Sequence, residues 1–587
     1  MTATVAVFGG GVGGLTAAHE LGERGFSVDV FERRPIVAAG GKARSIRVPG
    51  SAVGDRKPLP GEHGFRFFPG FYQHIPDTME RIPIEGQNKS VVDNLVTATK
   101  GLFAGERIAI TIPGSFPDTI DEIKSSLFGA IAASQVGVDP EELRFFIERL
   151  LVLLTMCPKR RFKELETKSW FEFVDADGRS NAYKKYLADG MTRRCVAARA
   201  DEMSARTCGV ILLQLLGCFE PGMHLDRLLN APTNDAWIDP WVAHSQSLGV
   251  RFHGEQELTG FECHGGRITG ATVQGPDGPA QITADYYVAA LPVDRMAPLV
   301  TDAMRAAAPS LEGMQELMDD VRWMNGIQFF LDRPLPIVKG HIVYPDGPFS
   351  LTSVSQAQFW ADVDLSGYGD GTVKDVLSVD ISDWETPGVL FNKRAMDLTP
   401  KEIEQEVIEQ LSRALNRDGE VGFPTDAIRH VFLDDDIVSP NPPGQPLVNL
   451  EPLLINKVNA WELRPPAVTG MENFFLAADY VQTNTDLATM EGANEAARRA
   501  VNGILEVERS RGGMTDQDDC RVFELREPAV FRPFKNLDDS LLDSNIEHLS
   551  EFLPAGFASA MLGFADVDGL AKLVDVKVLA DLFPFHF

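Results

Sequence analysis

The sequence is poor in cysteine, with six among 587 residues, and it contains no C-x-x-C pair. Such a chain is not a disulfide-stabilised scaffold, and it shows no zinc-ligand spacing. We expect the cysteines to be small buried apolar side chains in a reducing compartment, and we expect no metal site. They are Cys157, Cys195, Cys208, Cys218, Cys263 and Cys520.

Positive charge is also scarce. Lys and Arg total 55 against 84 Asp and Glu, which gives a formal net charge of −29. A surface of this sign repels phosphate backbones, so nucleic acid is excluded as an expected partner. It equally disfavours purely electrostatic docking on anionic lipid.

Long apolar runs are missing. The most apolar stretches, near residues 145–157 and 209–219, fall short of the ~20 residues that a membrane span needs. The first residues lack the basic start of a signal peptide, so we expect a cytoplasmic protein. One alternative stays open: the apolar helix expected over 143–157 runs into Lys159, Arg160 and Arg161, a pattern that also suits peripheral membrane contact.

The N-terminal residues match the start of a dinucleotide-binding fold. A short apolar strand at residues 5–8 leads directly into G-x-G-x-x-G, and a helical stretch follows that stops at Gly25. Glycines let backbone N–H groups and the helix N-terminus approach a diphosphate closely. The residues expected to do so are Gly9, Gly11, Gly13 and Gly14.

An acidic residue ends the second expected strand. Residues 27–31 form an apolar strand pattern that leads into Glu32. A carboxylate at this point accepts hydrogen bonds from the adenosine ribose and argues against a 2′-phosphate. We therefore expect Glu32 to bind the ribose.

The residues after Glu32 distinguish FAD from NAD. A second glycine pair, Gly40-Gly41, is followed by Lys42 and Arg44. This pattern resembles the flavin-dependent amine oxidase and phytoene desaturase superfamily. The resemblance implies that the cofactor is FAD and that its diphosphate and flavin edge are covered by this loop, where cations neutralise phosphate charge. Its candidate residues are Arg33, Gly41, Lys42 and Arg44. For either Lys42 or Arg44 alone, a solvated loop charge is the alternative.

Two later segments extend the resemblance. Residues 247–263 and 265–292 predict four strands, which in the superfamily belong to a small sheet within the FAD domain. That implies adenine contacts from the backbone at Glu257 and Leu258.

A strand ending in Asp479, a polar loop and a helix starting near Thr489 resemble the C-terminal FAD motif of carotene desaturases. In that family the Asp binds the ribityl or diphosphate region, and the helix start points N–H groups at the flavin C2 carbonyl. The corresponding residues are Asp479, Thr489, Met490 and Ala493.

These observations predict an α/β protein: a Rossmann-type FAD-binding domain with an inserted substrate domain of mixed sheet plus helices. We assign residues 1–75, 231–300 and 446–510 to FAD binding, and 76–230 and 301–445 to substrate binding. Residues 511–587 form a C-terminal extension of unknown role, whose apolar last residues either tuck onto the body or serve association.

The catalytic residues are less well marked. His63 and Arg66 lie in a stretch dense with Phe and Tyr, which in the superfamily passes close to the flavin. We take His63 and Arg66 as candidate catalytic residues, His63 as proton acceptor, and the rings as an apolar substrate wall. The alternative is an ordinary loop histidine among core aromatics.

The resemblance is to the branch of phytoene desaturases and hydroxysqualene dehydroxylases. It implies an FAD-dependent oxidoreductase that passes hydride between flavin and an apolar, isoprenoid or lipid-like small molecule. Three alternatives remain: a flavin amine oxidase, a redox-neutral lipid isomerase or hydratase, and a non-catalytic FAD-stabilised scaffold. The motif around Asp479 favours the desaturases over the amine oxidases. The electron acceptor and the oligomeric state do not follow from these residues.

Overall fold

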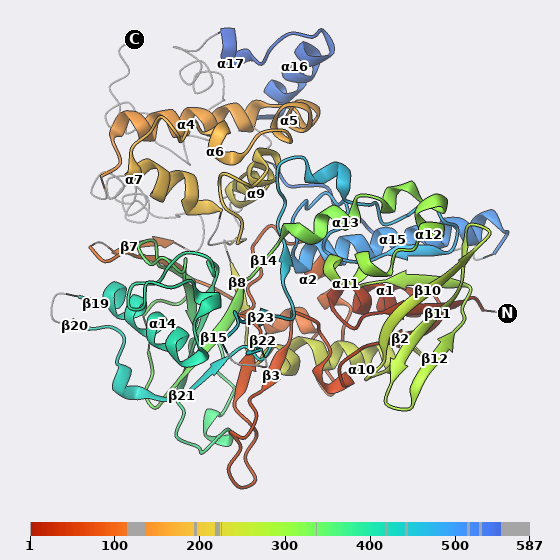
Figure 1. Cartoon of the computed structure of the whole chain (residues 1–587), viewed down its shortest axis with the longest axis horizontal. Helices are drawn as coiled ribbons and strands as arrows, with labels where there is room; N and C mark the ends of the chain where they lie inside the picture. Colours follow the sequence, from red (N-terminus) through yellow and green to blue (C-terminus); the bar gives the residue numbers. More distant parts are fainter. Residues whose placement is uncertain are drawn as a thin grey trace.

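The computed structural model describes residues 2–107, 109–113, 137–192, 197–217, 224, 226–335, 337–417, 420–440, 444–513, 517–527 and 531–552. Three bodies are visible in Figure 1: a parallel sheet with helices near the N-terminus, a second large sheet, and a helical group. Helices and sheets are mixed as predicted, which confirms the α/β class.

The first body is built on a five-stranded sheet in which every pair is parallel, in the order β25-β13-β1-β2-β9. Its helices α1 and α15 pack against each other, and α10 packs on α1. The strands are β1 (Thr4–Phe8), β2 (Ser27–Phe31), β9 (Arg251–His253), β13 (Tyr286–Ala289) and β25 (Phe474–Leu476). The helices are α1 (Val12–Glu23), α10 (Asp239–Ser247) and α15 (Met490–Ser510).

A three-stranded antiparallel sheet packs on this body through Phe261, whose ring makes edge contacts with Phe8 and Phe474. It contains β10 (Glu257–His264), β11 (Arg267–Gly275) and β12 (Gly278–Ile282). Two of the four strands predicted for this small sheet belong to the parallel sheet instead, where β9 pairs with β2 and β13 pairs with β1. The apolar core of this body also continues past residue 300 through α12 (Asp302–Ala307) and α13 (Met314–Leu317).

The second body is a seven-stranded sheet in the order β21-β15-β18-β17-β16-β6-β7. The β16–β6 pair is parallel and the other pairs are antiparallel, so the sheet is mixed as predicted. Its strands are β6 (Lys100–Ala104), β7 (Ala109–Pro113), β15 (Asn325–Leu331), β16 (Ile342–Val343), β17 (Thr352–Ser355), β18 (Asp375–Ile381) and β21 (Ile428–Leu433).

Helix α14 (Pro400–Leu415) covers this sheet. It begins at a capping box of Thr399 and Glu402 with Pro400 in the first turn, a favourable helix start. Its buried face shares one apolar core with the strands.

Short connecting elements join the bodies: α2 (His74–Glu80), α11 (Val293–Met296), β3 (Ser45–Arg47) with β4 (Pro60–Glu62), β5 (Leu95–Thr97) with β8 (Arg227–Leu229), β14 (Val321–Arg322) with β24 (Leu453–Leu454), and β22 (Ile437–Val438) with β23 (Val448–Asn449).

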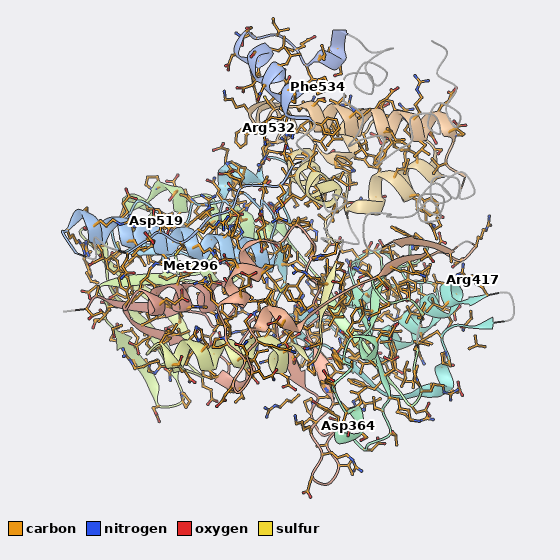
Figure 2. All side chains as sticks on the ribbon, turned by 180° about the vertical axis from the view of Figure 1, so that it is seen from behind. Met296, Asp364, Arg417, Asp519, Arg532 and Phe534 are labelled. Atoms are coloured by element: carbon orange, nitrogen blue, oxygen red, sulfur yellow. The ribbon has the colours of Figure 1, made fainter. Side chains whose placement is uncertain are left out.

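The helical group contains the predicted apolar helix as α4 and carries part of the C-terminal extension on its surface. Helix α16 packs on α4 and α5, and Phe534 of α16, labelled in Figure 2, packs against the apolar core of this group. The helices are α4 (Pro140–Thr155), α5 (Pro158–Leu165), α6 (Trp170–Phe173), α9 (Ala205–Gly217), α16 (Arg532–Asp543) and α17 (Leu549–Phe552). The apolar chain end lies outside the described residues.

Two of the cations proposed for membrane contact are buried. Arg160 Nε lies 2.7 Å from an oxygen of Asp538, and Arg161 Nη2 lies 2.7 Å from Glu527. Only Lys159 remains exposed, so this group does not present three charges to lipid head groups. Among the residues that the structure describes, no helix is both long and apolar enough to cross a membrane.

Of the cysteines, Cys157, Cys208 and Cys520 are buried, as expected, while Cys263 is half-buried. Cys195 and Cys218 lie outside the described residues.

Candidate functional site

A cavity of about 480 Å³ lies where the carboxyl ends of the parallel strands meet the second sheet. Residues that follow four strands line it: Gly9 after β1, Glu32 after β2, Ala290 after β13 and Ala477 after β25. Because parallel strands point their carboxyl ends to one edge, this edge gathers loops that are far apart in the sequence. It is the usual ligand site of such folds.

The first glycine turn is packed too tightly for side chains. A Cβ on Gly13 would lie 1.9 Å from Ala477 O, and one on Gly14 would lie 1.9 Å from Gly9 O. Helix α1 starts at Gly11 with no side-chain cap and no acidic residue in its first turn. Its first N–H groups are therefore available to a bound anion. Gly9, Gly11 and Gly13 line the cavity, whereas Gly14 supports the turn from behind.

Glu32 is buried at the end of β2, with its carboxylate held by two backbone amides. Gly10 N donates to Oε2 at 2.6 Å and Arg34 N donates to Oε1 at 2.9 Å. These bonds fix the carboxylate beside the glycine turn, where the sequence predicts the ribose.

Replacing Glu32 by Gln tests this placement. The new amide turns a donor toward an N–H group, and a bond to a charged acceptor stabilises by about 1.5–3 kcal/mol. We expect apoprotein to bind FAD about tenfold to a hundredfold more weakly, measured by fluorescence titration. Asp29→Asn, on the same strand but paired with Arg251 at the surface, should leave the affinity unchanged. If Glu32→Gln and wild type bound FAD with equal affinity, the Glu32 carboxylate would not contribute to FAD binding.

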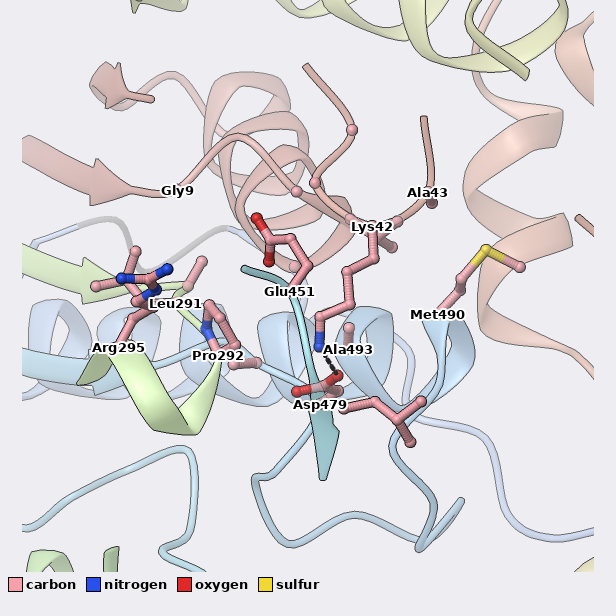
Figure 3. Close-up of a pocket in the computed structure, with 18 of the residues that line it drawn as sticks. Gly9, Lys42, Ala43, Leu291, Pro292, Arg295, Glu451, Asp479, Met490 and Ala493 are labelled. Carbon is pink, nitrogen blue, oxygen red and sulfur yellow. Dashed lines mark ion pairs between the residues drawn. The ribbon is translucent and has the colours of Figure 1, made fainter. Parts of the chain in front are cut away.

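Lys42 and Asp479 meet inside the cavity. Lys42 Nζ lies 3.6 Å from Asp479 Oδ2, and Figure 3 shows the pair beside Glu451. Glu451 forms ion pairs with Arg33 and Arg34, and although burial alone would raise its pKa, these cations hold the pKa below the usual range. Lys42 of the second glycine loop is thus joined to Asp479 of the C-terminal motif by an ion pair.

The start of α15 forms the neighbouring wall. The Thr489 hydroxyl accepts a hydrogen bond from Gly492 N at 3.1 Å, and Met490 and Ala493 line the cavity. Figure 3 places Met490 on the side of the cavity opposite Arg295. Glu257 and Leu258, predicted at the adenine, also line the cavity.

Arg44 is the exception among the charged candidate cofactor residues. Its guanidinium donates to Gly41 O at 2.8 Å and to Asp436 Oδ2 at 2.8 Å, and it does not line the cavity. We withdraw Arg44 as a cofactor ligand because an internal carboxylate already holds its charge.

His63 and Arg66 both line the cavity, together with Phe65, Phe67 and Tyr72, whereas Phe68 and Phe71 of the same stretch are buried in an apolar core instead. His63 Nδ1 lies 2.8 Å from Asp434 Oδ2 and 3.4 Å from Asp436 Oδ2. Burial opposes the charge on His63, but the two carboxylates raise its pKa. Arg66 donates to Gly64 O through Nε at 3.0 Å and Nη2 at 2.6 Å. The two carboxylates therefore favour the protonated form of His63.

Several lining residues were missed by the sequence analysis because no local motif marks them. They are Asp294, Arg295, Met324, Asp380, Glu451 and Leu453. Asp294 and Arg295 directly follow the predicted strand that ends at Pro292, so strand position was the available signal for these two. Of the remaining four, Met324 and Asp380 come from the region assigned to substrate binding, and Glu451 and Leu453 come from the start of the last segment assigned to FAD binding.

The donors present suit FAD. The uncapped start of α1 and the side-chain-free glycine turn fit a diphosphate, the fixed Glu32 carboxylate fits a ribose, and the start of α15 offers N–H groups to the electron-rich edge of a flavin. Gly41 and Lys42 close the diphosphate side. These features agree with the order of motifs in the sequence.

Comparisons with known proteins agree with this site. Residues 12–505 match the family model of flavin containing amine oxidoreductases. The chain is 24% identical over 535 residues to a zeta-carotene desaturase of Synechocystis sp., covering 85% of this chain and 97% of that one. It is 22% identical to a 15-cis-phytoene desaturase of Synechococcus elongatus, covering 85% and 95%.

Solved structures share the fold. A wild-type putrescine oxidase bound to putrescine superposes with a TM-score of 0.56 at 13% identity, covering 86% of this chain and 99% of that chain. An oxidoreductase from Methanosarcina mazei gives 0.54 at 14% identity, covering 86% and 100%. The chain therefore belongs to the flavin containing amine oxidoreductase family and is an FAD-dependent oxidoreductase.

Proposed function

We propose that the enzyme desaturates an apolar isoprenoid chain. The observation that carries the proposal is the aromatic and aliphatic part of the cavity lining, beside which the polar side chains of His63, Arg66 and Asp380 lie. This apolar part comprises Phe65, Phe67, Tyr72, Met324, Leu453 and Met490. Apolar walls exclude water and bind hydrocarbon without requiring a polar partner on it. The similarity to zeta-carotene and phytoene desaturases supports the same substrate class.

In this proposal the described chain divides the work. Glu32, the start of α1, Lys42 and the start of α15 hold FAD, which when bound supplies the two-electron oxidation by accepting hydride. The second sheet and the helices, within residues 76–230 and 301–445, bind the substrate. We propose no role in the reaction for residues 511–587.

An anaerobic absorbance experiment tests the proposal. Zeta-carotene and 15-cis-phytoene, each in detergent micelles, are added to the FAD-loaded enzyme, with putrescine and cyclohexylamine as amine probes. We expect a carotene to bleach the visible flavin band and to gain a conjugated double bond, seen as a red-shifted carotene spectrum. Bleaching by an amine alone would make the enzyme an amine oxidase. Conversion of a carotene without bleaching or loss of hydrogen would indicate redox-neutral chemistry.

A further inference from the structure

Asp380 is a buried carboxylate that faces the cavity from the second sheet. It lies near the end of β18, opposite Gly326 of β15 and Thr352 of β17, and it is 5% exposed. A Cβ on Gly64 would lie 2.7 Å from Asp380 Oδ1, and one on Gly326 would lie 2.9 Å from Gly64 Cα. The two glycines thus let the segment that carries His63 and Arg66 pack directly on the carboxylate.

One oxygen of Asp380 has no partner. Oδ1 is buried against Gly64 and makes no hydrogen bond in the structure, and Asp380 is one of the residues that line the cavity. The pKa of Asp380 is raised to about 7, because burial and Asp434 raise it by more than Arg66, His63 and a hydrogen bond from Phe65 N lower it. A carboxyl group of this kind changes protonation near neutral pH, which suits proton transfer.

The other titratable groups of the same wall are less suited to take a proton. Asp434 and Asp436 lie 2.8 Å and 3.4 Å from His63 Nδ1 and favour its protonated form, and an arginine such as Arg66 does not deprotonate in proteins. Burial raises the pKa of the Tyr72 phenol, so it stays protonated. Asp294 also has a buried oxygen without a hydrogen bond, but its other oxygen lies 3.5 Å from Nε of Arg295, a cation that favours the ionised carboxylate.

We propose that Asp380 is the base of the reaction and that its carboxylate takes the substrate proton. The inference rests on the desaturation proposed above, in which one carbon gives up a hydrogen with its electron pair to bound FAD. The C–H bond of the neighbouring carbon then breaks, its hydrogen passes as a proton to Asp380, and its electron pair becomes the new π bond. The substrate loses two electrons and two hydrogens. Asp380 afterwards returns the proton to solvent.

The variant Asp380→Asn keeps the shape of the side chain and removes its basicity. In the FAD-loaded enzyme we expect anaerobic flavin reduction by zeta-carotene to slow about a hundredfold, with the flavin content unchanged. The wild-type rate should rise with pH through an inflection near 7, because the base must be ionised, and the variant should lack this inflection. Wild-type rates in Asp380→Asn would overturn the inference.

Glu62→Gln is the matched control. Glu62 is also buried, with its pKa raised by burial to about 7, but it contacts Ser45 and Thr233 and does not line the cavity. Its removal should leave the rate of flavin reduction within about twofold of wild type and should keep the pH inflection. The same hundredfold loss in Glu62→Gln would mean that any buried carboxylate of this region matters, and would overturn the specific role of Asp380.

A measurement without substrate separates failure of this inference from failure of the proposed function. The flavin absorbance of the holoenzyme is titrated between pH 5 and 9, a range chosen to bracket a pKa of about 7. We expect a transition near pH 7 in wild type and Glu62→Gln that is lost in Asp380→Asn. If no carotene reduces the wild-type flavin, the proposed function falls, and this titration still decides the placement of Asp380. Absence of the absorbance transition near pH 7 in wild type, or its persistence in Asp380→Asn, overturns the inference.

Thermal unfolding of the apoprotein adds a further readout. With a folded pKa near 7 and a reference value of 3.8, the folded state binds the proton more tightly, so Asp380 destabilises the fold as pH rises from about 4 to 7. Asp380→Asn should therefore raise the Tm relative to wild type at pH 8 more than at pH 5. An equal difference at both pH values would contradict the raised pKa.

Discussion

Replacing Asp486 by Ala should destabilise the protein by about 3–5 kcal/mol, because it leaves the buried charge of Arg464 without its carboxylate and leaves Arg206 paired with Glu166 alone. Asp486 is 1% exposed and lies in the loop between Asp479 and α15. It accepts from Arg464 Nη1 at 2.6 Å, Arg206 Nη2 at 2.9 Å and the Thr207 hydroxyl at 2.7 Å. Its φ of 49° adds a smaller cost, since Asp tolerates the left-handed region better than Ala.

Urea unfolding monitored by circular dichroism measures this loss. Asp302→Ala removes an exposed ion pair, since Asp302 is 98% exposed and contacts Arg305 at 2.6 Å, and should change the free energy of unfolding by less than about 1 kcal/mol. The loss in free energy of unfolding for Asp486→Asn should fall between those of Asp486→Ala and Asp302→Ala, because the amide keeps a hydrogen-bond acceptor but carries no charge. A free energy of unfolding for Asp486→Ala equal to that of Asp302→Ala would refute the argument that this hub is energetically important.

The parts of the site that sequence predicts well are those fixed by local spacing. Gly9 to Gly14 can form only one kind of tight turn between a buried strand and a helix, and Glu32 must follow the next strand. The same holds for Asp479 and the start of α15. In each case strand, turn and helix are contiguous, so the pattern itself determines which backbone groups reach the cavity.

Long-range pairing decides the rest. Arg44 shows this: its nearest carboxylate partner, Asp436, is 392 residues away in the sequence, so nothing near Arg44 predicts that it turns from the cavity. Asp380 reaches the wall through the register of β18 against β15 and through the absence of side chains at Gly64 and Gly326. No spacing rule connects these residues. The buried bond between Arg160 and Asp538 likewise joins residues 378 positions apart and removes a cation that appeared exposed.

We expect Gly13→Ala to lose FAD. The new Cβ would lie 1.9 Å from Ala477 O and 3.0 Å from Ala477 C. That carbonyl belongs to the chain leaving β25, and Ala477 N donates to Ala289 O at 2.9 Å, so the backbone there is held in the sheet. The first turn of α1 must therefore move away, and its N–H groups leave the diphosphate position. We expect a loss of about 3 kcal/mol in binding, or about a hundredfold in FAD affinity.

The flavin-to-protein absorbance ratio of the purified variant, followed by titration of the apoprotein with FAD, measures this effect. Gly22→Ala is the control, because it lies in the same helix and its Cβ would meet only side-chain atoms, 3.1 Å from Val250 Cγ2 and 3.2 Å from Leu248 Cβ. These side chains yield by a few tenths of an ångström, and Ala favours the helix, so this variant should keep its flavin. If Gly13→Ala retained FAD with wild-type affinity, the close approach of α1 to β25 would not be what forms the diphosphate site.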